Sequence, residues 1–135
     1  MGKRKGTDWV KKYGRPGDQN YINVYLSIIE SEAYLYLRPL EKCLLQEFLV
    51  VNYKTKSNGR LNLSVEATAK RLGVAKNTLM PAYRVLQDHG FIECTTGAFP
   101  QERLARLWRI TFLPCNGREP TDEWRFWSAV EQYKV

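Results

Sequence analysis

The chain has few of the residues that build metal sites and disulfide frameworks. Among its 135 residues are 3 cysteines and 1 histidine. Cys43, Cys94 and Cys115 are odd in number and unequally spaced, which matches neither a disulfide framework nor a zinc-ligand pattern. A lone His89 excludes any site that needs two histidines. We therefore expect no metal and no cofactor, and this cysteine usage indicates a reducing, cytoplasmic environment.

Long apolar runs are also missing. The longest, Cys43 to Tyr53, is interrupted by Gln46 and Glu47, and it is much shorter than the roughly 20 residues that cross a bilayer. The chain starts Met-Gly-Lys-Arg-Lys-Gly with no apolar run behind it, so we expect no signal peptide and no membrane association. A composition of 44% apolar and 26% charged residues is typical of a globular domain.

Sequence motifs of catalysis are absent too. The chain has no glycine-rich phosphate loop, no His-Glu-x-x-His pattern and no cysteine–histidine nucleophile pattern. Its neighbouring carboxylates, Glu30 with Glu32 and Asp122 with Glu123, are more typical of solvated surface than of a catalytic pair. No ligand pocket is evident from the sequence. We expect that the protein is not an enzyme.

Positive charge is what the chain concentrates. The net charge is +7, and the excess lies in two segments. Residues 1–20 carry six Lys or Arg against two Asp, and residues 54–87 carry seven Lys or Arg against one Glu. Such a distribution indicates a polyanionic partner, of which nucleic acid is the first candidate, and a solvated basic surface is the alternative.

Periodicity predicts the elements of the N-terminal half. Residues 1–20 are expected to form a flexible basic arm. Residues 21–29 alternate between apolar and polar side chains, which predicts a strand, and residues 31–37 suit one helical turn. Pro39 suits the first position of a helix that runs to about Tyr53. The core-facing stripe of that helix is Leu40, Leu44, Phe48 and Val51, widened by Leu45 and Leu49.

Capping residues and periodicity predict the remaining elements. Ser64 caps a helix that Gly73 ends, and a second helix runs from about Lys76 to Gly90. Residues 91–95 and 108–113 form two strands joined by a loop over 96–106. The last element is expected to be a short helix that begins at Thr121 or Asp122 and holds Trp124, Phe126, Trp127, Val130 and Tyr133.

Two short helices joined by a tight glycine turn and followed by a hairpin resemble a winged helix-turn-helix. The resemblance is carried by residues 63–79, which read LSVEATAKRLGVAKNTL, and by the His-Gly-Phe-Ile joint after the second helix. Ala69 allows close helix approach, Gly73 accepts a left-handed backbone, and Leu79 anchors the second helix. The implied fold class is mainly α with a small antiparallel β-sheet.

Further segments resemble a group of small winged-helix proteins borne on plasmids and prophages, some of which repress conjugative transfer. They are Leu61-Asn-Leu-Ser, Trp108-Arg-Ile-Thr-Phe-Leu-Pro-Cys, and Gly117-Arg-Glu-Pro-Thr with a trailing Trp. The match covers about residues 21–127. It implies a double-stranded DNA-binding transcriptional regulator, a repressor that occludes a promoter as a dimer. With no ligand pocket evident, control is expected from protein level or a partner.

The resemblance also assigns DNA contacts. In helix-turn-helix proteins the second helix lies in the major groove with its N-terminal residues at base edges. The residues placed there are Lys76, Asn77, Thr78, Arg84 and Gln87, with Ala75, Met80 and Pro81 on the same outward side. Asn77 suits adenine, and Lys76 or Arg84 suits guanine or a phosphate. The expected phosphate and wing contacts are Lys70, Arg71, Arg60, Arg103 and Arg106.

The flanking segments divide the chain into three parts. We expect an arm over 1–20, the winged-helix domain over 21–115, and a C-terminal turn and helix over 116–135. In the arm, residues 11–17 read KKYGRPG and resemble part of an AT-hook, so Lys12 and Arg15 are expected at a minor groove, with a Pro-Gly linker as the alternative. Part of the aromatic C-terminal helix is expected to pack on the domain. Its homodimer contact is expected to be Trp124, Trp127 and Val130.

Two residues depart from the helix-turn-helix pattern. Ala75 stands where a capping serine is usual, and Pro81 lies inside the second helix, which predicts a kink or a helix divided at Pro81. These departures favour a different function, a winged-helix module that binds a protein, for example an antagonist of a host or phage system. A replication-initiation or partition accessory is a third possibility. We also expect Cys43 and Cys94 in the core, and we expect His89 to cap the carbonyls at the end of its helix or to interact with the helix dipole.

Overall fold

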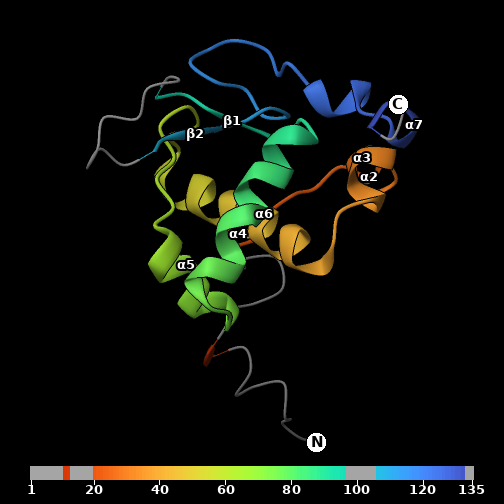
Figure 1. Cartoon of the computed structure of the whole chain (residues 1–135). Coiled ribbons are helices and arrows are strands. Elements are labelled where there is room, and N and C mark those ends of the chain that lie inside the picture. The colour runs from red at the N-terminus through yellow and green to blue at the C-terminus, as the bar shows by residue number, and fades with distance from the viewer. Residues whose placement is uncertain (1–10, 13–19, 97–105, 133–135) are drawn as a thin grey trace, which may run out of the picture.

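The computed structural model in Figure 1 describes residues 11–12, 20–96 and 106–132. In chain order the elements are α2 (Leu26–Ile29), α3 (Glu32–Leu35), α4 (Pro39–Thr55), α5 (Val65–Leu72), α6 (Lys76–Asp88), β1 (Ile92–Cys94), β2 (Trp108–Ile110), the 3-10 helix η2 (Glu123–Phe126) and α7 (Ala129–Gln132). The expected class, mainly helical with a small antiparallel sheet, is confirmed. Within the described ranges, no helix is long and apolar enough to cross a membrane.

The helix α4 forms the centre of the molecule. Pro39 occupies its first turn, as the sequence predicts, and the Glu41 carboxylate accepts a hydrogen bond from the Arg38 backbone N–H at 2.7 Å. The side of α4 that faces the core buries four large apolar residues: Leu44, Leu45, Phe48 and Leu49. Each such burial contributes about 1.5–3 kcal/mol relative to exposure. The helix therefore serves as the support on which the later elements pack.

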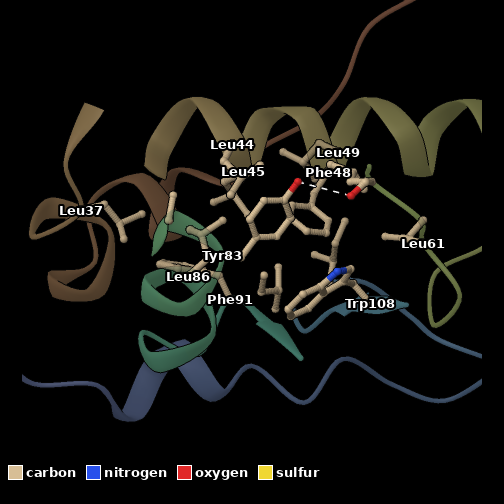
Figure 2. Close-up of a cluster of buried hydrophobic side chains, with 14 of the residues drawn as sticks. Leu37, Leu44, Leu45, Phe48, Leu49, Leu61, Tyr83, Leu86, Phe91 and Trp108 are labelled. Atoms are coloured by element: carbon tan, nitrogen blue, oxygen red, sulfur yellow. Dashed lines mark hydrogen bonds between the residues drawn. The ribbon is translucent and has the colours of Figure 1, made fainter. Parts of the chain in front are cut away.

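An aromatic cluster joins α4 to α6 and the sheet. Phe48 of α4 lies 5.9 Å from Tyr83 of α6 and 6.0 Å from Trp108 of β2, measured between ring centres. Tyr83 and Trp108 are 5.7 Å apart, and Figure 2 shows the Phe48 and Tyr83 rings beneath α4, with Trp108 on the side of the strands. Because edge-to-face and offset rings attract each other, this cluster fixes the position of α6 against α4.

The pair α5 and α6 forms as predicted. The Ser64 hydroxyl accepts a hydrogen bond from the Ala67 backbone N–H at 3.2 Å, and Gly73 ends α5 with a φ of 72°. Only Val74 and Ala75 then separate Gly73 from the first residue of α6. Ala75 makes no side-chain cap, and α6 continues unbroken through Pro81. The alternative of a helix divided at Pro81 is therefore wrong.

The sheet contains β1 and β2 and is extended by one residue. The two strands pair antiparallel, with Glu93 opposite Arg109. On the other edge of β2, Leu61 and Trp108 exchange backbone hydrogen bonds of 3.0 and 2.9 Å. The predicted strand over 108–113 is shorter than expected and ends at Ile110. The expected alternation of buried and exposed side chains ends there, because Thr111 is buried. The Thr111 hydroxyl donates a hydrogen bond to the Gly90 carbonyl at 2.6 Å.

The strand predicted over residues 21–29 is wrong. The segment ends in the helical turn α2, and of its expected buried side chains only Ile28 is buried. Ser31 explains the helical choice, because its hydroxyl donates to the Ile28 carbonyl at 2.7 Å and accepts from the Tyr34 N–H at 3.2 Å. The Ser31 side chain thus ends α2 and caps α3, and α3 is the helical turn that the sequence predicts over 31–37.

The single helix predicted near the C-terminus is also wrong. The segment forms η2 and α7, with extended backbone at Trp127 between them. The expected cap does not form, because Asp122 has a φ of 52° and its carboxylate accepts from the Trp124 indole N–H at 3.0 Å. Trp124 instead enters the core and stacks on Phe91, 6.3 Å between ring centres.

His89 joins α6 to two distant segments. Its ring nitrogen Nδ1 hydrogen bonds to the Ala33 carbonyl at 2.7 Å, and its ring stacks on Trp127 at 4.1 Å between centres. The expectation that its side chain caps carbonyls of its own helix is therefore wrong, and the alternative of an interaction with the dipole of that helix stays a prediction. The expectation of Cys43 in the core is wrong as well, because Cys43 is exposed on the side of α4 that also carries the exposed Gln46, while Cys94 is half-buried.

Candidate nucleic-acid interface

The helix α6 has two chemically distinct faces. Its inner face is buried and consists of Leu79, Ala82, Tyr83 and Leu86. Its outer face is exposed and consists of Lys76, Asn77, Thr78, Met80, Pro81, Arg84 and Gln87. No acidic residue occurs in α6 before Asp88. The five α6 residues predicted to contact DNA thus share the outer face with Met80 and Pro81.

Pro81 does not interrupt this outer face. A proline in a helix leaves the carbonyl four residues earlier, here that of Asn77, without its backbone donor. Both Asn77 and Pro81 lie on the exposed face, so water can satisfy that carbonyl. Because the helix continues, Lys76, Met80 and Arg84 follow one another at intervals of four residues, which places them along one ridge.

The two basic residues predicted on α5 differ in their environment. Lys70 is exposed. Arg71 makes two hydrogen bonds to the Glu47 carboxylate, of 2.6 and 3.1 Å, and this carboxylate raises the pKa of Arg71. The guanidinium side chain still has 62% of its surface exposed, whereas that of Glu47 has 10%. Arg71 therefore anchors α5 to α4, and its charge is partly neutralised there.

The remaining predicted contacts are spread out. Arg106 is exposed just before β2, and Lys12 is exposed. Arg103 and Arg15 lie outside the described residues. Arg60 is exposed but does not join the α6 face; it lines an open groove of about 930 Å³ at the end of α4. The structure thus brings together the predicted residues of α5 and α6 and separates Arg60 from them.

Sequence reasoning missed that groove and the role of Arg109. The groove draws its walls from residues far apart in the chain, including Tyr21, Asn52, Lys56 and Asn116. Arg109 is only 12% exposed and is held by Glu93 at 2.9 Å, Thr121 at 2.8 Å and Glu123 at 3.2 Å. It therefore fastens β2 to the C-terminal segment. The alternating pattern over 108–113 predicted on which side of the strand Arg109 lies, but it did not predict these three partners.

Several exposed apolar residues belong to the elements at the end of the molecule opposite α5. There α2, α3 and α7 gather (Figure 1), and the Ala129 N–H donates to the Glu32 carboxylate at 2.9 Å. The large apolar residues exposed in this region are Leu26, Leu35, Tyr36, Phe126 and Val130. The predicted dimer residue Val130 is 72% exposed, whereas Trp124 is 5% exposed and belongs to the core.

No protein family, no curated protein and no solved structure matches the chain.

Proposed function

We propose that this protein binds double-stranded DNA through the outer face of α6 and acts as a transcriptional regulator, a repressor that occludes a promoter. The observation that carries the proposal is the division of α6 into a buried apolar face and an exposed face with cations and amides. A helix presenting such a face fits the major groove of DNA, where amide and guanidinium groups read base edges.

The order of elements supports a winged helix-turn-helix fold. Two short helices, α5 and α6, meet at a tight turn that Gly73 begins, and the paired strands β1 and β2 follow. Leu61 adds a bridge to β2 ahead of the two helices. In this fold the hairpin formed by the two strands is the wing, which places Arg106 beside the duplex.

Each exposed residue of the face has a role in this proposal. Asn77 pairs with adenine through its amide, and Arg84 with guanine or a phosphate. Lys70 and Lys76 bind phosphates, which position the protein without reading sequence. Arg71 contributes less than a free arginine because Glu47 already accepts its hydrogen bonds.

Two arginine variants test the proposal. Fluorescence anisotropy with a duplex of roughly 30 base pairs, about three turns of DNA, measures the affinity of the wild type, Arg84→Ala and Arg118→Ala. Arg118 is exposed on the turn after β2, so it serves as a control with the same loss of charge. We expect Arg84→Ala to weaken binding about tenfold, and Arg118→Ala to leave it unchanged within about twofold.

Equal effects of the two variants would mean that only net charge attracts DNA and would contradict the assignment of α6. No binding by the wild type at low salt would contradict DNA binding altogether.

The exposed apolar residues of α3 and α7 favour a second copy of the chain as a partner, or else the alternative function of a protein-binding module. We propose a homodimer that uses Val130 with Leu35 and Tyr36, because aromatic and aliphatic residues are enriched at such interfaces. Sedimentation velocity should then give a dimer, and Val130→Asp should give a monomer while Glu131→Ala stays dimeric. A monomeric wild type would contradict the dimer and leave the protein-binding module as the role of these exposed residues.

A further inference from the structure

An open groove at the C-terminal end of α4 has the size of a ligand site. Its volume is about 930 Å³, within the range of small-molecule sites. Three segments distant in sequence form its walls: residues 20–23, residues 49–60 with gaps, and residues 113–116 with a gap. Among the described residues, none from α5 or α6 lines it, so it is separate from the proposed DNA interface.

The composition of the groove suits an anionic ligand. Of the described residues that line it, Lys56 and Arg60 are cationic and none is acidic. Both cations are exposed. Ile22, Leu49 and Leu113 supply the apolar part of the lining and are themselves half-buried or buried. A ligand that combines negative charge with a flat, partly apolar group matches this arrangement.

Lys56 is held in a conformation that the backbone alone would not favour. It ends α4 with a φ of 50°, a left-handed position that glycine normally occupies. Its N–H still donates to the Asn52 carbonyl at 2.7 Å, and its ammonium lies 5.1 Å from the centre of the Tyr53 ring. Asn116, also on the groove, has a φ of 53°. Unfavourable backbone conformations of this kind gather at ligand sites.

The groove also offers an aromatic ring and free amides. Tyr21 is 71% exposed and, in the described part of the chain, makes no ring contact. The side chains of Asn20, Asn23 and Asn52 make no hydrogen bond within the same part. Amides both donate and accept, and exposed tyrosines stack on nucleobases.

We propose that this groove binds a nucleotide unit, with its phosphate at Lys56 and Arg60, its base against Tyr21, and the asparagine amides at the base edge. The nucleotide is either free in solution or part of a single strand, since both present the same phosphate and base. The site goes beyond the proposed duplex interface and does not depend on it.

Calorimetric titration with adenosine diphosphate, and separately with a short single-stranded oligonucleotide, tests the proposal at near-physiological salt. Lys56→Gly removes the ammonium and also relieves the left-handed backbone, so the variant should fold at least as well as the wild type. Lys54→Ala removes an exposed lysine of α4 that does not line the groove. We expect Lys56→Gly and Tyr21→Leu each to weaken binding about tenfold, and Lys54→Ala to have no effect beyond about twofold.

Binding of the diphosphate identifies a free nucleotide as the ligand. Binding of the oligonucleotide alone identifies a single strand. Either result supports the proposal if Lys56→Gly weakens the binding. If neither the diphosphate nor the oligonucleotide binds, the proposal is overturned. Equal weakening by Lys54→Ala and Lys56→Gly would also overturn it, as would a loss of oligonucleotide binding in Arg84→Ala with Lys56→Gly unaffected. None of these outcomes decides whether α6 binds duplex DNA.

Discussion

Single residues fix the end of α6 that leads into the sheet. Gly90 has a φ of 87°, and a Cβ built there would lie 2.7 Å from the Glu123 carbonyl carbon and the Trp124 backbone nitrogen. Gly73, in the turn between α5 and α6, has a φ of 72°, and no atom of the described residues lies within 4 Å of such a Cβ. The two glycines therefore share a backbone requirement but differ in their surroundings.

This difference predicts unequal costs for one substitution. Gly73→Ala should lower the free energy of unfolding by about 1–2 kcal/mol, the cost of a left-handed alanine. Gly90→Ala should cost about 3 kcal/mol or more, because backbone atoms of η2 must also move. Urea denaturation followed by circular dichroism measures both, and similar losses would show that the C-terminal segment does not pack on Gly90.

The buried Tyr83 makes the stability of the fold depend on pH. Burial raises its pKa above the ordinary value of 10.0; Thr68 opposes this increase, and the charge of Glu47 adds to it. The unfolded chain therefore releases this proton at a lower pH than the folded chain. The stability contributed by neutral Tyr83 is complete below about pH 10 and is lost as the pH rises through the raised pKa.

We accordingly expect the free energy of unfolding to fall above about pH 10 in the wild type. In Tyr83→Phe the fall should be smaller, because the buried ring no longer ionises. Tyr36→Phe, at a position that is 56% exposed, should keep the wild-type profile. Chemical denaturation at a series of pH values measures the three profiles, and identical curves for wild type and Tyr83→Phe would refute the argument.

At the scale of elements, α6 forms despite two unfavourable residues. It begins without a side-chain cap at Ala75 and contains Pro81. The energy that holds it comes from its buried face, where Leu79 and Leu86 are fully buried and Tyr83 joins the aromatic cluster. Packing thus outweighs local preference, as is common for helices in proteins.

The stability of α6 should therefore rise when these two residues are replaced. Ala75→Ser should add about 1 kcal/mol through a new cap, and Pro81→Ala up to about 3 kcal/mol. Pro114→Ala, in the exposed loop after β2, is the control and should not stabilise. The midpoint of urea denaturation reports each change. A destabilised Pro81→Ala would mean that the proline fixes a helix geometry the fold requires.

The elements differ in how well the sequence predicts them. Local signals sufficed for α4, α5 and α6, where Pro39, Ser64 and Gly73 mark the ends and apolar residues repeat at helical spacing. The segment 21–29 has an alternating pattern but pairs with no strand in the described part of the chain, and the Ser31 hydroxyl favours a turn. The C-terminal segment forms two short helices because Trp124 packs in a core made by residues distant in sequence. A local sequence pattern does not reveal such a contact.

At the scale of the whole molecule, the candidate site was only partly predictable. The outward residues of α6 follow from helical spacing, so their exposure was foreseen. The ion pair of Arg71 with Glu47 spans two helices, and Arg60 faces a groove whose walls are remote in sequence. Contacts of that kind depend on how the elements pack, and the sequence alone does not give that packing.

Duplex binding by the α5–α6 face predicts a definite dependence of the affinity on salt concentration. Lys70, Lys76 and Arg84 are exposed on these two helices. Neutralising three phosphates gives a slope of about −2.7 for the logarithm of affinity against the logarithm of salt concentration. Arg71, Arg106 and Lys12 would make it steeper.

The most direct measurement is therefore the affinity of the wild type for duplex DNA over a salt series, by fluorescence anisotropy. Duplex binding through these residues predicts a slope of about −3 or steeper. A slope near zero, or no binding at the lowest salt, would contradict it.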